Sequence, residues 1–131
     1  MARKITRKAL SDKLDKVSKQ IVKLRDGNVC QHCGKWVEGR DRQASHVIPV
    51  SAGNKLRWDP MNMKVLCNYC HLHWWHKNPM EAAQWFEEKF PDRWEYLQAN
   101  RGIAKFTVPQ LEDKLGELQD ALNKLEHLDK A

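Results

Sequence analysis

The chain has 131 residues, of which 41% are hydrophobic and 31% charged, a composition that fits one modest folded domain better than a disordered segment. No apolar run approaches the ~18 residues that span a bilayer, and the first residues are charged rather than apolar. These features argue against a membrane protein and a secretory signal, so we expect a cytoplasmic protein with no membrane partner.

The positive charge is concentrated in the first two thirds of the chain. Residues 1–28 carry nine Lys/Arg against three Asp/Glu, and residues 29–80 carry seven against three. Residues 81–108 carry four against five, and residues 109–131 carry three against six. Clustered basic residues are typical of proteins that bind nucleic acid, because neutralising phosphates releases counterions. The alternative is a charge excess that only keeps the protein soluble.

Residues 1–27 form the first expected segment. Apolar residues recur at spacings of three and four from Leu10 to Leu24 with lysines between them, which predicts a basic amphipathic helix over residues 6–25. Asp26-Gly27-Asn28 ends it by turn chemistry. Its lysines either follow DNA phosphates or form an ordinary solvated face. The residues that we expect to contact nucleic acid are Lys16, Lys19 and Lys23, together with Arg57 further along the chain.

Two Cys-x-x-Cys pairs, Cys30/Cys33 and Cys67/Cys70, indicate a structural zinc site. Each two-residue gap lets both sulfurs turn toward one point, and four thiolates suit a tetrahedral zinc ion. Two disulfides, with three pairings, are the alternative in a secreted protein, but no signal segment supports it. The 33 residues between the pairs exceed the usual zinc-ribbon interval, so we expect an insertion there.

Residues 28–78 predict a ββα unit clamped by zinc. A strand carries His46 near its end, a loop runs over 51–62, a second strand covers 64–66, and a helix starts at Cys70 or His71 and stops at Asn78-Pro79. The metal supplies folding energy that such a small core lacks. We expect Trp74 and Trp75 in the core and His32 packed beside the zinc.

The remaining residues predict helical support. Residues 79–108 contain two aromatic-rich helices separated by Pro91. Residues 109–131 form a helix with a leucine seam that either pairs with the first helix or zips to a second copy, giving a homodimer. The fold class expected is α+β, mostly helical: a zinc-stapled ββα centre with N- and C-terminal helical extensions. The seam is formed by Leu111, Leu115, Leu118, Leu122 and Leu125.

The two cysteine pairs, the Ser45-His46-Val47-Ile48-Pro49 segment and the run from Asn62 to His71 resemble, in this order, the HNH or ββα-metal endonuclease superfamily. The Ser-His step and residues 56–62 are similar to phage recombination nucleases of the NinG/Rap type. The resemblance implies a metal-dependent endonuclease that hydrolyses DNA phosphodiester bonds. It further suggests a recombination or DNA-processing role, in the host cell cytoplasm if the protein is phage-encoded.

The resemblance implies catalytic roles for His46, Asn62 and His71. His46 would be the general base, for which a pKa near ~6.5 is suitable. Asn62 would accept the imidazole N–H of that base and fix its direction, although an asparagine here also suits an ordinary turn. His71 would hold the catalytic Mg²⁺, Mn²⁺ or another divalent ion.

One position departs from the common family pattern. Many members place Asp before the base histidine as a second metal ligand, whereas this chain has Ser45. A hydroxyl is a weak ligand, so we expect weak Mg²⁺ binding and better activity with Mn²⁺, Co²⁺ or Ni²⁺. Helical spacing predicts that His73 and His76 share a helix face, with His73 turned away from His71, and we expect surface histidines rather than DNA contacts or a second metal site.

Two other functions fit parts of this pattern. A non-catalytic zinc module that binds DNA would need the cysteine pairs and the basic helix but no array of His46, Asn62 and His71. A protein-interaction adaptor built on the leucine seams would show no affinity for nucleic acid.

Overall fold

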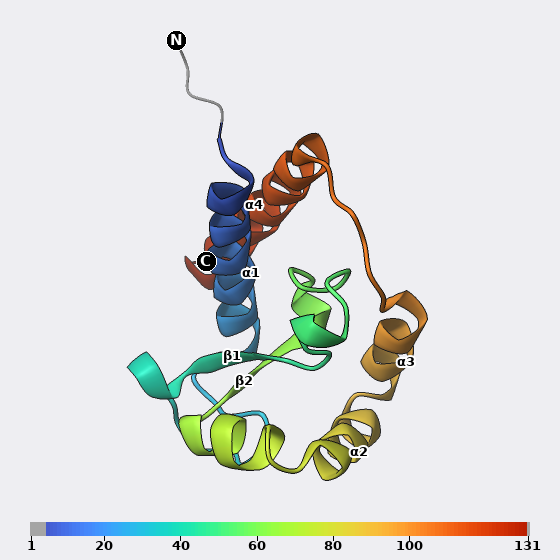
Figure 1. Ribbon diagram of the computed structural model, residues 1–131. Helices are drawn as coiled ribbons and strands as arrows, with labels where there is room; N and C mark the ends of the chain where they lie inside the picture. Colours follow the sequence, from blue (N-terminus) through green and yellow to red (C-terminus); the bar gives the residue numbers. More distant parts are fainter. Residues whose placement is uncertain (1–4, 131) are drawn as a thin grey trace.

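The computed structural model describes residues 5–130 of the chain (Figure 1). The architecture is α+β and mostly helical, with one small antiparallel sheet, as expected. Among the described residues, no helix combines the length and the apolar character needed to cross a membrane. In chain order the elements are α1 (Arg7–Asp26), β1 (Gln43–His46), β2 (Met63–Leu66), a π-helix (Cys70–Trp75), α2 (Pro79–Lys89), α3 (Pro91–Asn100) and α4 (Val108–Lys130).

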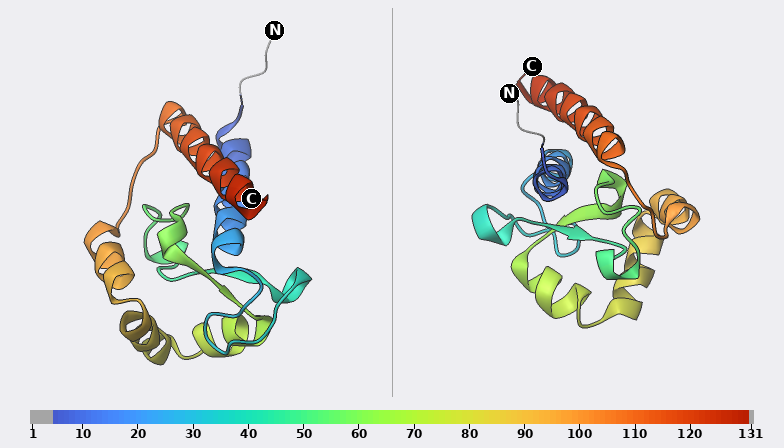
Figure 2. Two further views of the ribbon diagram at one scale, coloured as in Figure 1. Left: turned by 180° about the vertical axis from the view of Figure 1, so that it is seen from behind. Right: turned by 45° about the horizontal axis from the view of Figure 1, so that its top comes forward.

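Helices α1 and α4 lie side by side at one end of the molecule (Figures 1 and 2). Their leucine stripes face each other and are buried in one cluster, which includes Leu10 and Leu14 of α1 and Leu111 and Leu115 of α4. Burying a leucine side chain contributes roughly 1.5–3 kcal/mol. The seam of α4 is therefore occupied within one chain, which is the first of the two pairings expected.

Strands β1 and β2 pair antiparallel, with Ser45 opposite Lys64 and His46 opposite Met63. The π-helix follows β2 and packs beneath the sheet, and α2 and α3 continue from it in an arc around the loop between the strands (Figure 1). The strand, loop, strand, helix order is the one expected. The helix, however, is not an α-helix: the N–H of His76 bonds to the carbonyl of His71, five residues back, at 3.2 Å.

The loop between β1 and β2 is pinned to the segment that joins α3 to α4. Asn54 donates from Nδ2 to the carbonyl of Ala104 and accepts the N–H of Ala104 at Oδ1, both at 2.9 Å. Gly53 passes so close to Gly102 that a Cβ at Gly53 would lie 2.5 Å from its carbonyl oxygen. The C-terminal segments thus hold the loop that follows His46.

Candidate active site and metal centre

The four cysteines meet at one point below the sheet. The first pair lies in a tight turn closed by the Gly34 N–H on the carbonyl of Cys30 at 2.9 Å, and the second pair spans the end of β2 and the start of the π-helix. Their four Sγ atoms all lie within 4.8 Å of one another. The set is positioned to bind a metal ion.

His32 closes one side of this cysteine cluster, as expected. Its ring stacks on Trp74, with 3.5 Å between ring centroids, and its Nδ1 lies 3.3 Å from Cys70 Sγ. Trp74 and Trp75 are both buried, so their assignment to the core is confirmed. The two rings serve different regions, because Trp74 faces the cysteine cluster while Trp75 packs under Lys64.

His71 is paired with His76, a contact that the sequence analysis missed. The two Nε2 atoms are 3.0 Å apart, and the ring centroids are separated by 4.7 Å. The expectation that His76 shares a face with His73 is wrong because it used the 3.6-residue turn of an α-helix. The π-turn brings residues five apart onto one face. His73 lies elsewhere, next to Tyr69 and Lys77.

Gln43 of β1 fixes the protonation pattern of His71. Its Oε1 lies 2.5 Å from His71 Nδ1, and because an amide oxygen can only accept, Nδ1 carries the proton. Nε2 of His71 therefore presents a lone pair toward His76. Burial lowers the pKa of His71 to about 4, with further contributions from the neighbouring charges of His76 and Lys64. The imidazole is thus neutral near pH 7, the form that binds metals.

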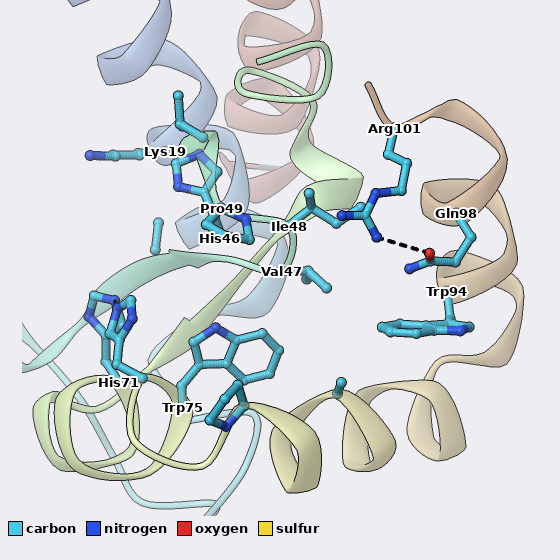
Figure 3. A pocket seen from close by; sticks show the side chains of 15 residues that line it. Lys19, His46, Val47, Ile48, Pro49, His71, Trp75, Trp94, Gln98 and Arg101 are labelled. Carbon is cyan, nitrogen blue, oxygen red and sulfur yellow. Dashed lines mark hydrogen bonds between the residues drawn. The ribbon is translucent and has the colours of Figure 1, made fainter. Parts of the chain in front are cut away.

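His46, at the end of β1, lies on the other side of the same cavity, which has a volume of about 490 Å³ (Figure 3). Its Nε2 donates to the carbonyl of Arg57 at 2.9 Å, which leaves Nδ1 as the nitrogen that can accept a proton. Burial lowers the pKa of His46, and the charges of Lys19 and Lys64 lower it further, outweighing the hydrogen bond to Arg57.

Asn62 does not contact the ring of His46 in the way expected. Its side chain is buried and binds backbone: Oδ1 accepts from Ile48 N–H at 2.8 Å, and Nδ2 donates to the carbonyls of Ile48 and Leu56 at 3.0 and 3.2 Å. The carbonyl of Arg57 occupies the position beside the imidazole instead. Asn62 therefore fixes the chain just after His46, a role close to that of a turn former.

Ser45 points away from His46, because neighbouring residues of a strand face opposite sides. Its buried hydroxyl accepts from Lys64 Nζ at 3.1 Å, and Lys64 also donates to the carbonyl of His46 at 3.0 Å. The Lys64 ammonium lies 3.1 Å from the centre of the Trp75 ring. Burial, followed by the charge of Arg93, lowers the pKa of Lys64 well below its usual range. The expectation of Ser45 as a weak ligand has no support in this geometry.

The four predicted contacts to nucleic acid divide into two groups. Lys19 lies at the edge of the cavity that holds His46 and His71, and Lys23 lines the groove on the other side of His71. Lys16 is exposed on α1 and lines neither. Arg57 is already engaged, since its guanidinium donates to both carboxylate oxygens of Asp15 at 3.1 and 2.9 Å. Arg57 contributes to the site through its backbone carbonyl, which accepts from His46, and not through its charge.

Three groups at the site escaped sequence reasoning: His76, the Gln43 amide and the Arg57 carbonyl. The five-residue interval between His71 and His76 was the one available signal, and a π-turn was needed to recognise it. Gln43 precedes His46 by three residues on β1, and its reach to His71 across the hairpin depends on the tertiary fold. A backbone carbonyl leaves no mark in the sequence.

Comparison with known proteins agrees with this geometry. Residues 30–87 match the family model described as HNH endonuclease, a range that begins at the first cysteine, ends within α2 and contains His46, His71 and His76. Neither the curated proteins nor the solved structures gave a match, and the narrower similarity to NinG/Rap-type nucleases is not shown. Residues 30–87 of this chain are therefore similar to the HNH endonuclease family.

Proposed function

We propose that the chain is a metal-dependent DNA endonuclease in which His46 activates water and His71, with His76, holds a catalytic divalent ion. The observation that carries the proposal is the cavity shared by these three histidines. In His46 and His71 a hydrogen bond to the other ring nitrogen fixes which nitrogen is free to act. Among the described residues, the cavity is lined by Lys19 and Arg101 and by no carboxylate, which suits a phosphodiester at its edge.

His46 acts through Nδ1, which takes a proton from the attacking water while Nε2 remains bonded to the Arg57 carbonyl. That carbonyl keeps the ring in place and stabilises the imidazolium that forms, because it accepts from a more acidic N–H. Lys64 fixes the carbonyl of His46 from the opposite side of the strand. Lys19 attracts a phosphate to the edge of the cavity.

The fit of a divalent ion to His71 and His76 rests on their two Nε2 atoms. Ligand nitrogens lie about 2.0–2.1 Å from a first-row ion, so two ligands of one ion lie within about 4.2 Å of each other. The separation of 3.0 Å meets this requirement. His71 and His76 would hold the ion at the cavity, where it would supply Lewis-acid stabilisation of negative charge. Imidazole ligands favour Mn²⁺, Co²⁺ or Ni²⁺ over Mg²⁺.

We propose zinc for the cysteine cluster, because four thiolates in tetrahedral range are its preferred structural ligand set. This ion serves folding rather than chemistry. The assignment of DNA as the substrate rests on the family resemblance, and the cytoplasmic setting stays a prediction. A phage recombination role rests on the resemblance of the Ser45-His46 step and residues 56–62 alone. A homodimer would need a surface other than the occupied leucine seam.

The test is cleavage of a supercoiled plasmid and of a branched DNA by the zinc-loaded protein with added Mn²⁺ or Mg²⁺. His46→Ala should lower the rate by roughly 10²–10⁴ and leave DNA binding nearly intact, since a base acts in the transition state. His76→Ala should raise the Mn²⁺ concentration needed for half-maximal rate. His73→Ala is the matched control, because His73 is exposed and lies outside the cavity.

Two results would reject the proposal. If the His46→Ala protein cuts DNA at the wild-type rate, His46 is not the general base. A wild-type protein that binds DNA but cuts none with any of these ions leaves the non-catalytic zinc module as the function.

A further inference from the structure

The cavity beside His46 and His71 has a second wall that the cleavage chemistry does not use. Figure 3 shows this wall on the side of α3, where Trp94, Gln98 and Arg101 face the loop after β1. The volume of the cavity, about 490 Å³, lies within the ~300–1,000 Å³ typical of small-ligand pockets. Apart from the histidines and a few polar residues, the cavity is lined by apolar side chains, among them Val47, Ile48 and Trp75.

The groove on the other side of His71 has the opposite character. It has a volume of about 900 Å³, and its lining includes Lys19, Lys23, Arg40 and Arg42. The single carboxylate among its lining residues, Asp41, is paired with Lys35 at 2.9 Å. Lys19, Ala44 and His71 line both the groove and the cavity, so the two are continuous across His71. Phosphates therefore suit one side of His71 and an uncharged flat group suits the other.

We infer that the cavity receives one unpaired nucleobase of the DNA substrate, next to the phosphate at His46 and His71. This inference deepens the proposed nuclease function and rests on it. Trp94 is half-buried and held by Phe86, with 6.3 Å between ring centroids, so it offers a fixed ring for stacking. A positively charged groove joined to an aromatic surface is the arrangement that binds single-stranded nucleic acid.

Gln98 and Arg101 supply hydrogen bonds for the edge of the base. Arg101 Nη1 donates to Gln98 Oε1 at 3.2 Å, which orients the pair at the rim of the cavity (Figure 3). The Gln98 amide N–H groups and the remaining guanidinium N–H groups can then donate to base carbonyls and ring nitrogens. Both side chains belong to exposed residues, so they can adjust to different bases.

A base inside a duplex is stacked and paired, and it reaches a side cavity only after it leaves the helix. The substrate class that fits is therefore DNA with unpaired nucleotides at the cleavage point: single strands, or the unpaired bases of branched and mismatched DNA. Fully paired DNA binds through the basic groove alone, with its base outside the cavity.

The test separates base contacts from phosphate contacts. Fluorescence anisotropy without added divalent ion measures binding of a labelled oligothymidylate and of an abasic oligonucleotide of equal length and charge. The wild-type protein should bind the oligothymidylate about tenfold or more tightly, the scale of one stacked base. In Trp94→Ala this ratio should fall close to one. In Arg101→Ala the lost charge weakens binding of both oligonucleotides equally and leaves their affinity ratio unchanged. Any decrease in this ratio therefore measures the loss of contact with the base.

Gln98→Ala is a second variant on an exposed side chain, and it should lower the ratio even if Trp94→Ala disturbs folding. Trp36→Ala is the matched control, because Trp36 is an exposed tryptophan that lines neither the cavity nor the groove. Equal binding of the two oligonucleotides by the wild-type protein, or an unchanged ratio in all three cavity variants, overturns the inference. Cleavage of plasmid and of single-stranded DNA in the same preparation shows separately whether the nuclease proposal stands.

Discussion

Asn62 offers the sharpest test of how the candidate site is held together, because its side chain bonds to backbone rather than to the catalytic ring. Asn62→Ala removes three hydrogen bonds, one from Ile48 N–H and two to the carbonyls of Ile48 and Leu56. All three backbone groups lie in a buried region. They lose their partner without gaining access to bulk water.

The magnitude follows from the number of groups left unpaired. A buried polar group without a partner costs roughly 1–3 kcal/mol, and some relaxation is expected, so the three together should cost about 3–5 kcal/mol. That is a large part of the roughly 5–15 kcal/mol that stabilises a typical domain. The loop after His46 should also loosen, and a misplacement of about 1 Å costs up to about 10² in rate.

Denaturant unfolding of zinc-loaded protein measures the first effect, and plasmid cleavage at a temperature where the variant is folded measures the second. Asn123→Ala is the control, because Asn123 is exposed on α4 and its loss should change stability by about 0.5 kcal/mol or less. If Asn62→Ala unfolds within about 1 kcal/mol of wild type, the buried network does not support the site in the way described.

Three further predictions concern the supports of the site. Asp15→Ala removes the partner of Arg57 and of the Trp58 indole N–H; it should destabilise the fold by about 1–3 kcal/mol and lower the cleavage rate without weakening DNA binding, measured by anisotropy. The lowered pKa of His46 keeps this base neutral near pH 7, so the rate should fall only as the pH drops below about 6.5, and a midpoint above that value would contradict the assignment. The lowered pKa also affects stability. The unfolded chain binds a proton at His46 more readily than the folded protein, so the free energy of unfolding should decrease as the pH falls below the pKa of His46 in the unfolded chain. Cys67→Ser should reduce bound zinc and lower the melting temperature, and elemental analysis with thermal unfolding checks both.

The long helices and the cysteine cluster were predictable because their signals are local and periodic. The leucine spacing of α1 and α4 encodes one apolar stripe on each, and burying both stripes together is the natural solution within one chain. The two-residue gaps of the cysteine pairs fix the direction of their sulfurs. In the same way, turn residues at 26–28 and 51–54 marked where α1 ends and where the loop begins.

The details of the site depend on contacts between distant residues, and these could not be read from the chain. Arg57 was expected to contact nucleic acid, whereas its charge is engaged by Asp15, which lies 42 residues away. Ser45 was expected at the metal through its place beside His46, but strand alternation turns it toward Lys64. The contact of His76 with His71 was missed because an α-helical period was assumed for this segment.

The π-helix has a practical consequence for any study of this protein with chelators. Cys70 of the cysteine cluster and His71 of the candidate catalytic pair are neighbours on the same turn. Stripping zinc would release the first residue of that turn and with it the spacing of His71 and His76. Inhibition by EDTA therefore does not reveal which ion was removed. Recovery on adding Mn²⁺ alone indicates a reversible loss at the histidines, whereas a need for zinc first indicates that the turn itself had come apart.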